Sequence, residues 1–291
     1  MGLEEKIIEK KSIYEKYYKI FIFISIAFLV LSLLYVCSYF YFNKEPFKRD
    51  ISLTGGTIIT IHGDFDENRI KEVISKYTSS YKIKTTQDIY TQQVVSKIIE
   101  TKLEEERAKE FIKEINVTDY SIEITSPELG MGFFKQLIFA IIIAFLFMAI
   151  TVFIIFRTFI PSLAVILAAL TDIIGTLAIL NLLKIEIGAA GIAAFLMLIG
   201  YSVDTDIMLT TKIIRTRERP LVDRIKSALK TGLTMTLTSL IAIFIAFIFT
   251  TSLTLKQIFM ILCIGLAIDI FSTWIGNISI LIWHVKKKYK E

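Results

Sequence analysis

The chain has 291 residues, of which 54% are hydrophobic and 21% are charged, and its formal net charge at pH 7 is +5. So large an apolar share is unusual for a water-soluble domain and indicates an integral membrane protein. The two cysteines and two histidines are too few and too scattered for a disulfide framework or a metal site, so no metal and no cofactor are expected.

Six predicted transmembrane helices account for this composition. An α-helix needs about 20 mostly apolar residues to cross a bilayer, and six stretches meet that requirement. The first is interpreted as an uncleaved anchor, because its apolar core is too long for a signal peptide and it lacks a small-x-small cleavage site. The predicted fold class is therefore an α-helical integral membrane protein. The spans are Ile20–Phe42, Phe133–Phe156, Ile160–Leu183, Ile187–Thr211, Gly232–Leu253 and Ile258–Trp283.

The segment between the first two spans is the one region with the composition of a soluble domain. Alternation over residues 56–63, "GTIITIHG", predicts a strand. Residues 64–77, "DFDENRIKEVISKY", have helical spacing, with Asp64 or Asp66 as the N-cap. The segments that follow predict two strands, a helix and a last strand, in "YKIKTT", "QQVVSKII", "EEERAKEFIKEI" and "DYSIEIT". The order β-α-β-β-α-β predicts a ferredoxin-like α+β domain between helices 1 and 2.

The distribution of lysine and arginine predicts how the spans are oriented. Three segments are rich in basic residues, whereas the connections near Lys184 and Lys256 hold one each. In a six-span chain the three basic segments fall on one side, which predicts a multi-pass protein of the cytoplasmic membrane with both termini in the cytoplasm. The positive charge is thus a topological signal and not a sign of nucleic-acid binding. The predicted parts are a cytoplasmic arm 1–19, transmembrane helix 1 at 20–42, an extracytoplasmic α+β domain at 43–132, transmembrane helices 2–6 within 133–285 including the basic cytoplasmic loop 212–230, and a cytoplasmic tail 286–291.

Four carboxylates and one lysine stand within or at the end of the predicted spans. Ionisable side chains there cost about 2.5–3.5 kcal/mol each at a helix centre and usually face the bundle interior or water. Asp172 and Asp269 are near the middle of the third and sixth spans. Asp204 and Asp206 are nearer the cytoplasmic end of the fourth, and because two residues turn a helix by about 200° they cannot share one face. Together with Lys212, two turns after Asp204, these residues predict coupling to an ion or a proton gradient.

Hydroxyl and amide side chains in the fifth and sixth spans predict a polar seam beside these carboxylates. Thr234 and Thr238 are one turn apart in the fifth span. Thr273 and Asn277 follow Asp269 on the same helical face of the sixth. A plainer alternative is that the threonine hydroxyls only satisfy carbonyl groups of their own helix.

Three stretches inside the membrane carry a family resemblance. The stretch "GYSVDTDIMLTTKIIRTRE", which opens with Gly200, Tyr201 and Ser202, resembles the fourth-span signature of the SecF branch of the SecD/SecF family of protein-export membrane proteins, approximately G-Y-S-L-N-D-x-x-V-x-x-D-R-I-R-E. Residues 170–180, "LTDIIGTLAIL", are similar to the third-span H-D-x-x-x-T-x-G of that family. Residues 231–240, "TGLTMTLTSL", resemble its threonine-rich fifth span.

Two further motifs stand at the ends of the predicted exterior domain. "LTGGT" looks like the F-T-G-G-T that opens this domain in SecF, and "SPELG" is similar to the G-P-x-x-G that closes it. With these two motifs the resemblance covers essentially the whole chain, in the family's order. The matched positions are Thr54, Gly55, Gly56, Thr57, Pro127 and Gly130.

The fourth-span stretch also departs from the bacterial pattern of the family. Asp204 stands where the family has Asn, and Lys212 keeps the charge of a family Arg. Asp206 is an added carboxylate, so only Asp172 matches a family carboxylate directly. These departures indicate an archaeal-type member of the family.

The resemblance implies a subunit that pairs with a SecD-like protein in an assembly of the resistance–nodulation–division superfamily. Such an assembly is associated with the Sec translocation channel and uses a proton or sodium gradient to assist export of the translocating polypeptide. The partners expected are therefore the SecD-like subunit, the Sec channel, the exported chain and the lipid bilayer. The protein is expected not to be an enzyme. Within this scheme Asp172 is the principal titrating group, Asp204, Asp206 and Lys212 form its relay or counter-charge, and Asp204 faces Asp172 or the partner subunit.

Other interpretations stay open at this point. A small-molecule or lipid transporter of the same superfamily would need a substrate cleft, for which the predicted exterior domain is small. An intramembrane aspartyl protease would need Asp172 opposite Asp204, but the Gly-x-Gly-Asp element of such enzymes is missing. A third alternative is a structural clamp for the channel, with inert carboxylates. For Asp206 alone, a plainer interpretation is that it only pairs with Lys212 or Arg215 near the membrane surface.

Overall fold

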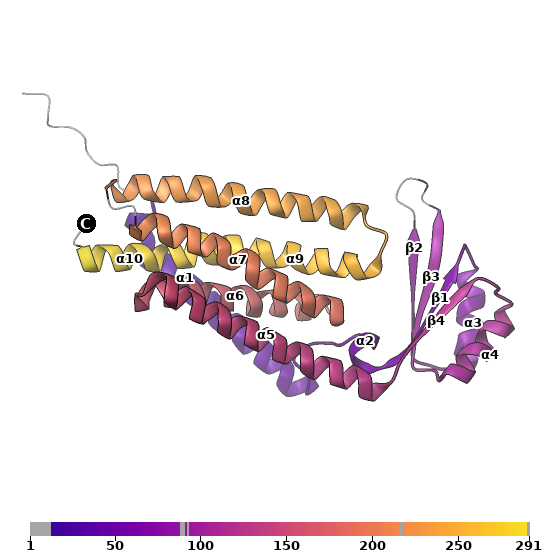
Figure 1. Cartoon of the computed structure of the whole chain (residues 1–291). Helices are drawn as coiled ribbons and strands as arrows, with labels where there is room; N and C mark the ends of the chain where they lie inside the picture. Colours follow the sequence, from indigo (N-terminus) through magenta and orange to yellow (C-terminus); the bar gives the residue numbers. More distant parts are fainter. Residues whose placement is uncertain (1–12, 88–90, 92, 216–217, 290–291) are drawn as a thin grey trace, which may run out of the picture.

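The computed structural model describes residues 13–87, 91, 93–215 and 218–289. Long helices lie side by side in a bundle, and a small sheet with two helices stands at one end of it (Figure 1). Among the described residues six helical segments are long and apolar enough to cross a membrane. The predicted helical membrane fold is thus confirmed, whereas positions 1–12 of the expected arm and 290–291 of the expected tail lie outside the described residues.

Five of the spans are single helices, and the sixth is built from three consecutive elements. Within the last span a short π-helical segment, η1, separates two α-helices. The spans are α1 (Ile13–Asn43), α5 (Pro127–Phe156), α6 (Phe159–Leu182), α7 (Ala189–Arg215), α8 (Leu221–Phe249) and the run of α9 (Leu253–Phe271), η1 (Ser272–Asn277) and α10 (Ile278–Tyr289).

Several helix ends differ from the predicted spans. α7 continues to Arg215 and α8 already begins at Leu221, so most of the expected loop 212–230 is helical. At the other end of the bundle, α5 begins at Pro127, within the expected exterior domain 43–132. The reason is that apolarity marks only the membrane-embedded part of a helix, while backbone hydrogen bonding continues beyond it.

The centre of the bundle is formed by α6, α7 and the last span. We compared the most apolar 18 residues of each span. In each of the three central spans 50% of these residues are buried inside the chain, compared with 6% in α1, 6% in α5 and 11% in α8. Large apolar side chains such as Phe23, Phe147 and Phe244 therefore point away from the protein on the outer helices. A polar side chain on the inner helices is consequently held among other helices and not exposed to lipid.

The exterior domain has the predicted ferredoxin-like topology. Its four strands are antiparallel in the order β2-β3-β1-β4, which matches a β-α-β-β-α-β chain order. Asp66 is the N-cap of its first long helix and accepts a hydrogen bond from the backbone N of Asn68. The elements are α2 (Ile51–Thr54), β1 (Gly56–His62), α3 (Glu67–Tyr77), β2 (Tyr81–Gln87), β3 (Val94–Thr101), α4 (Glu105–Ile115) and β4 (Tyr120–Thr125).

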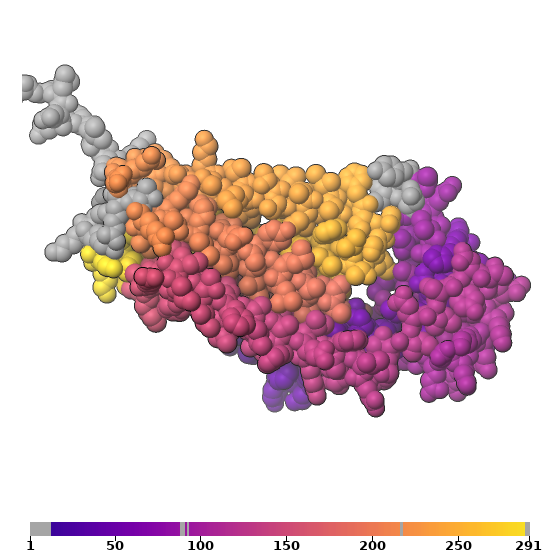
Figure 2. Space-filling view, viewed as in Figure 1, coloured from indigo at the N-terminus to yellow at the C-terminus, as the bar shows by residue number. Residues whose placement is uncertain are grey.

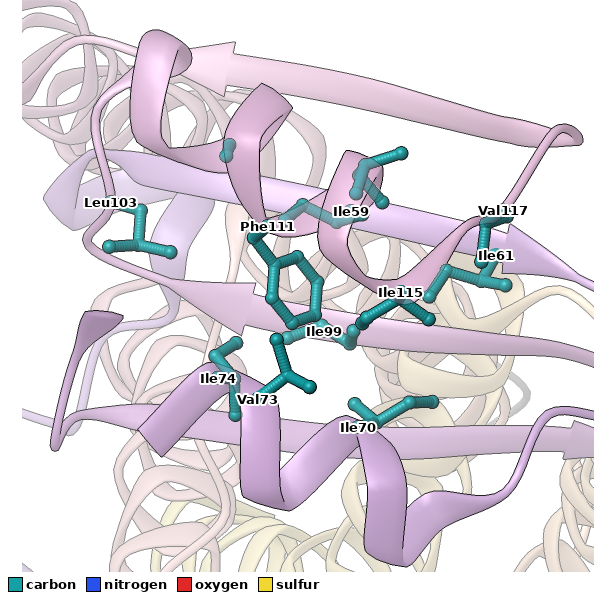
Figure 3. Close-up of a cluster of buried hydrophobic side chains, with 12 residues drawn as sticks. Ile59, Ile61, Ile70, Val73, Ile74, Ile99, Leu103, Phe111, Ile115 and Val117 are labelled. Carbon is teal, nitrogen blue, oxygen red and sulfur yellow. The ribbon is translucent and has the colours of Figure 1, made fainter. Parts of the chain in front are cut away.

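The core of this domain lies between the sheet and its two helices (Figure 3). Ile59 of β1 is opposite Ile99 of β3 on one side and Ile122 of β4 on the other. Ile83 of β2 continues the same row, so isoleucines meet across all four strands. α3 and α4 cover this row, with Phe111 of α4 fully buried against it. Among the described residues of the domain, no helix covers the opposite face of the sheet, which turns toward the bundle (Figure 1).

The two connections of the exterior domain to the membrane are packed tightly against each other. Gly55 has a φ of 82°, in the left-handed region that favours glycine, and a Cβ there would lie 2.5 Å from the Cα of Pro127. A Cβ on Gly130 in the first turn of α5 would lie 2.8 Å from the backbone N of Gly55 and 3.0 Å from the carbonyl of Leu53. Residues about 75 positions apart in the chain thus form one junction, at which the domain joins the bundle.

Candidate functional site

Three carboxylates lie together in the interior of the bundle. Asp172 comes from α6, Asp206 from α7 and Asp269 from α9, and they are 1%, 0% and 0% exposed. These helices form the centre of the bundle, which explains why all three side chains are removed from lipid. Asp172 and Asp206 accept hydrogen bonds from other spans, whereas Asp269 accepts one from Thr273 in its own span.

Asp172 accepts hydrogen bonds from two serines. Ser202 of α7 donates its hydroxyl to Oδ2 at 2.5 Å. Ser272, at the start of η1, donates to Oδ1. The carboxylate of α6 is therefore tied to both neighbouring central helices, and a change in its charge acts on all three.

Asp206 and Asp269 share a single hydroxyl. Oγ1 of Thr273 lies 2.9 Å from Oδ1 of Asp206 and 3.2 Å from Oδ1 of Asp269. Nδ2 of Asn277 also donates to Oδ1 of Asp206, at 2.6 Å. Because a threonine hydroxyl carries one hydrogen, it can donate to only one of the two carboxylates at a time. Asp206 and Asp269 therefore compete for one hydrogen-bond donor, the hydroxyl of Thr273.

The π-helical segment η1 supplies most of these donors. Ser272, Thr273 and Asn277 all come from its six residues, and all three side chains reach the cluster. Gly276 of the same segment lies elsewhere, because a Cβ on it would be 2.3 Å from the hydroxyl of Ser25 in α1. A π-helical turn is wider than an α-helical one and often occurs at functional sites. Here it brings three polar side chains to the cluster while a glycine allows α1 to approach.

The cluster has little compensation for negative charge. Among the described residues, Oδ2 of Asp206, Oδ2 of Asp269 and Oδ1 of Asn277 have no hydrogen-bond partner. None of the hydrogen bonds or ion pairs of this part of the chain joins a lysine, arginine or histidine to Asp172, Asp206 or Asp269. Three unpaired buried charges are strongly unfavourable in a low-dielectric interior. The chemistry that this arrangement supports is the uptake of protons, or of a monovalent cation held by carboxylate and hydroxyl oxygens.

The other residues expected at the site lie outside the cluster. Asp204 is exposed on the surface of α7, so the expectation that it faces Asp172 is corrected: Asp206 occupies the inward position. Lys212 donates to the hydroxyl of Thr231 at 2.5 Å and to the carbonyl of Ser227 at 3.1 Å, both on α8, and contacts neither aspartate. Of the three residues expected to form a relay or counter-charge for Asp172, only Asp206 lies in the cluster, and Lys212 is hydrogen-bonded to α8 instead.

The polar seam also differs from the expected one in the fifth span. Thr234 and Thr238 are exposed, and each donates to a carbonyl of its own helix, as in the plainer alternative. Thr236 is the buried threonine of α8, and its hydroxyl lies 3.5 Å from that of Thr205 on α7. Thr234 and Thr238 do lie on one face of α8, but that face is turned away from the bundle.

Two contributors to the site were not among the expected ion-coupling or seam residues. Ser202 was noted only as part of the "GYS" motif, and Ser272 was not singled out at all. The signal in the sequence is the density of polar residues in "DIFSTWIGN", residues 269–277, within a span. Gly200 and Tyr201 of the same motif are exposed on α7, so only its serine faces inward.

The residues of the "TGGT" motif act at the junction with the exterior domain. Thr54 donates its hydroxyl to the carbonyl of Asp50 at 2.9 Å and closes the turn of α2. Gly56 begins β1. Thr57 is buried and donates to the carbonyl of Leu103 at 2.5 Å, which ties β1 to the segment before α4. The motif therefore shapes the start of the domain and takes no part in the carboxylate cluster.

Comparison with known proteins identifies the family. Residues 104–287 match the model of the family described as "Protein export membrane protein SecD/SecF, C-terminal". The chain is 36% identical over 279 residues to the protein-export membrane protein SecF of Methanocaldococcus jannaschii, covering 93% of this chain and 96% of the relative. It is also 36% identical over 252 residues to SecF of Pyrococcus furiosus, covering 83% of this chain and 82% of the relative.

A solved structure has the same fold. The crystal structure of SecDF, a translocon-associated membrane protein from Thermus thermophilus, superposes with a TM-score of 0.72 at 18% sequence identity. The match covers 98% of this chain but only 40% of the SecDF chain, so the present protein spans about two-fifths of that larger one. With its family match, its relatives of similar length and its membrane-spanning helices, this multi-pass membrane protein belongs to the SecF branch of the SecD/SecF family of protein-export membrane proteins.

Proposed function

We propose that this chain is a SecF-type subunit that assists protein export across the cytoplasmic membrane, driven by a proton or sodium gradient. A SecD-like subunit and the Sec channel are the proposed partners, and a translocating polypeptide is the substrate. The family match and the relatives of similar length support the role in export. The proposal contains no enzymatic step.

The observation that carries the proposal is the buried cluster of Asp172, Asp206 and Asp269. A proton or cation that enters the cluster removes one negative charge and with it the repulsion from the other two. Because the three residues lie on three different helices, the change in charge alters how α6, α7 and α9 pack together. An elementary charge that crosses the membrane potential releases about 2.3 kcal/mol per 100 mV, which is enough to bias a two-state packing.

The alternatives are less well supported. A small-molecule or lipid transporter is not favoured, because the relatives that this chain matches over most of their length are protein-export proteins. An aspartyl protease built on Asp172 and Asp204 would need the two carboxylates to face each other, and Asp204 is on the outer surface of α7. A structural clamp with inert carboxylates is distinguished from ion coupling by the following experiment.

The test replaces Asp172 by Asn in the complex reconstituted with its partner and the channel in vesicles. We expect Asp172→Asn to abolish the stimulation of export by an imposed gradient, while export without a gradient and assembly of the complex are retained. Asp223→Asn is the matched control, because Asp223 is an exposed carboxylate in the first turn of α8. Full stimulation in an assembled Asp172→Asn complex would contradict the proposal and favour the clamp.

Two features support the proposed orientation and partner face. Lys286 of α10 donates to the backbone carbonyl of Glu15 in α1 at 3.1 Å, so the described ends of the chain meet on one side of the bundle. We assign that side to the cytoplasm because it carries the basic residues. Between α5 and α8, no helix of the part of the chain that the structure describes covers the outer face of α7 (Figure 2). Asp204 lies on this face close to the depth of Ser202, which makes the face a place for a partner and not for lipid.

A further inference from the structure

The loop between α6 and α7, residues 183–188, reaches out of the bundle and meets the exterior domain. The backbone N of Ile187 donates to the carbonyl of Lys48 at 2.8 Å, and the N of Asp50 donates to the carbonyl of Ile187 at 3.2 Å. Arg49 and Ile187 form a short parallel bridge between these two hydrogen bonds. The loop is thus joined by its backbone to the segment that leads from α1 into the exterior domain.

Glu186 contacts three different parts of the chain, two through its side chain and one through its backbone carbonyl. Its carboxylate pairs with Lys82 of strand β2 and lies 3.0 Å from Nζ of Lys48. Its backbone carbonyl accepts a hydrogen bond from Nε2 of Gln257 in α9, at 2.8 Å. The carboxylate side chain is only 17% exposed, whereas the two lysines are about half exposed. One residue therefore connects the sheet, the segment after α1 and a central helix.

Gly188 holds this contact at close range. A Cβ on Gly188 would lie 2.0 Å from Oδ2 of Asp50, so the side chain of Asp50 rests directly on the glycine backbone. The next residue, Ala189, donates its backbone N to the hydroxyl of Ser52 in α2 at 2.9 Å. The N-terminal end of α7 and the start of the exterior domain are therefore closely packed against each other.

The same two helices carry the carboxylate cluster. Asp172 lies ten residues before the last residue of α6, which is about 15 Å along the helix axis at a rise of 1.5 Å per residue. Asp206 and Ser202 lie on α7, which leaves the loop on its other side. On the outer side of the loop there is a chamber of about 870 Å³ between the bundle and the open face of the sheet. Lys82 and Glu186 both line it, so the ion pair between the loop and β2 forms part of its wall.

We infer that the α6–α7 loop transmits movement from the carboxylate cluster to the exterior domain, with Glu186 as the positioning residue that holds β2 to the loop through Lys82. The inference rests on the proposed function, since it requires that the cluster change the packing of α6 and α7. Occupation of the cluster shifts these helices, the loop shifts with them, and the pairs of Glu186 with Lys82 and Lys48 pull the sheet along. The chamber changes its shape in the same step.

The experiment measures the distance between the exterior domain and the bundle in the complex with its partner, in lipid nanodiscs. Spin labels are attached at Glu110 on α4 and Ile154 on α5, both exposed, after Cys37 and Cys263 are replaced by alanine. Asp172→Asn serves as the permanently neutral form of the cluster. We expect this exchange to shift the label-to-label distance when the loop contact is intact.

The decisive variants change the charges of the contact. Glu186→Lys places three lysines together and is expected to remove most of the shift caused by Asp172→Asn, because like charges now separate the loop from β2. The double variant Glu186→Lys with Lys82→Glu re-forms an ion pair of reversed polarity between positions 186 and 82 and is expected to restore the shift. Glu114→Gln is the matched control, because Glu114 pairs with Lys76 inside the exterior domain, away from the bundle.

The outcomes separate this inference from the proposed function. A shift of unchanged size in Glu186→Lys overturns the role of the loop, even if Asp172→Asn still abolishes gradient-stimulated export. Loss of the shift in both the single and the double variant likewise overturns it, because charge pairing would then not be the cause. Normal gradient-stimulated export in Asp172→Asn overturns the proposed function itself. Loss of the shift in Glu186→Lys with recovery in the double variant supports the inference.

Discussion

Asp204 and Asp206 are two residues apart in α7 and end in opposite surroundings. Asp206 is fully buried and accepts hydrogen bonds from Thr273 and Asn277, whereas Asp204 is exposed on the outer face. The angle of about 200° between them follows from helix geometry alone. Which of the two points inward depends on where α9 and η1 lie, since these supply the donors. For that reason the local pattern separated the two residues correctly, but it did not decide whether Asp204 faces Asp172 or a partner; the structure excludes the first alternative.

The ionisation of Glu186 should affect the contact between the α6–α7 loop and the exterior domain. Burial alone would raise its pKa, but the hydrogen bonds and charges of Lys82 and Lys48 outweigh burial and hold the pKa below its usual value. A carboxylate with a lowered pKa stabilises the contact at pH values above its unfolded pKa of about 4.3, and this contribution is lost as the pH falls through the lowered value.

We therefore predict that the contact between the loop and β2 is constant between about pH 5 and 8 and weakens below about pH 4. Hydrogen exchange of the β2 amides in the membrane-embedded complex measures this directly. Glu186→Gln should already show the faster exchange at neutral pH and should respond less to acid, because it removes the titrating group. An acid response of equal size in both proteins would show that other carboxylates cause it.

At the scale of elements, the first turns of α5 contain two glycines with opposite surroundings. Gly130 packs against the backbone of Gly55 and Leu53, whereas a Cβ on Gly132 would meet nothing within 4 Å. The pattern "PELGMG" does not distinguish them, since both are simply glycines near the start of a helix. Only the position of α2 against α5 leaves no room for a side chain on Gly130.

Gly130→Ala should destabilise the junction by about 1–3 kcal/mol, because the backbone of Leu53 and Gly55 must move to admit a methyl group. Gly132→Ala is the matched control and should leave stability unchanged or raise it slightly, since alanine favours helix over glycine by about 1 kcal/mol. Thermal unfolding of the purified protein in detergent compares the two. Equal midpoints for the two variants would refute the packing argument.

The last span shows how an element departs from a simple helical pattern. The sequence predicts one apolar helix with a polar face that follows Asp269, and Thr273 and Asn277 do lie at the cluster. The π-helical segment η1 adds Ser272 and turns Gly276 toward α1. No pattern of apolar spacing announces such a wide turn, because it depends on which helices surround the segment.

At the scale of the whole molecule, the outer face of α7 is the feature that best supports the proposed protein partner. α5 and α8 flank this face, and their own outer surfaces are rich in large apolar side chains, as expected for contact with lipid. Asp204 and the small residue Gly200 lie between them, and nothing lies within 4 Å of a Cβ built on Gly200. A carboxylate next to space for a close helix approach fits a protein partner better than a lipid chain.

Asp204→Leu is predicted to reduce the amount of the SecD-like partner that co-purifies by about tenfold, because the partner group opposite Asp204 loses its counterpart. If the face instead met lipid, leucine would be more favourable than aspartate and recovery of the complex would be unchanged or better. Met197→Leu, an apolar exchange on the same exposed face, is the control. Quantitative mass spectrometry of the tagged protein from native membranes provides the measurement.

The sequence by itself determined the class of the protein, its six spans, the ferredoxin-like order of the exterior domain and the family. These depend on properties that a short window already contains: the length of an apolar stretch, the alternation of a strand, the spacing of a helix and the order of local motifs. Asp172, Thr273 and Asn277 could be named as candidates for the same reason, since a polar residue in an apolar span is conspicuous without any knowledge of its neighbours.

Only the tertiary structure decided which faces of the helices point inward. It placed Asp206 and not Asp204 in the cluster, Thr236 and not Thr234 or Thr238 in the interior, and Lys212 beside α8. It also brought Glu186 to Lys82, more than 100 residues away. A helix in a membrane carries no water-facing side to set its rotation, so its orientation follows from packing against its neighbours, and that information is spread over the whole chain.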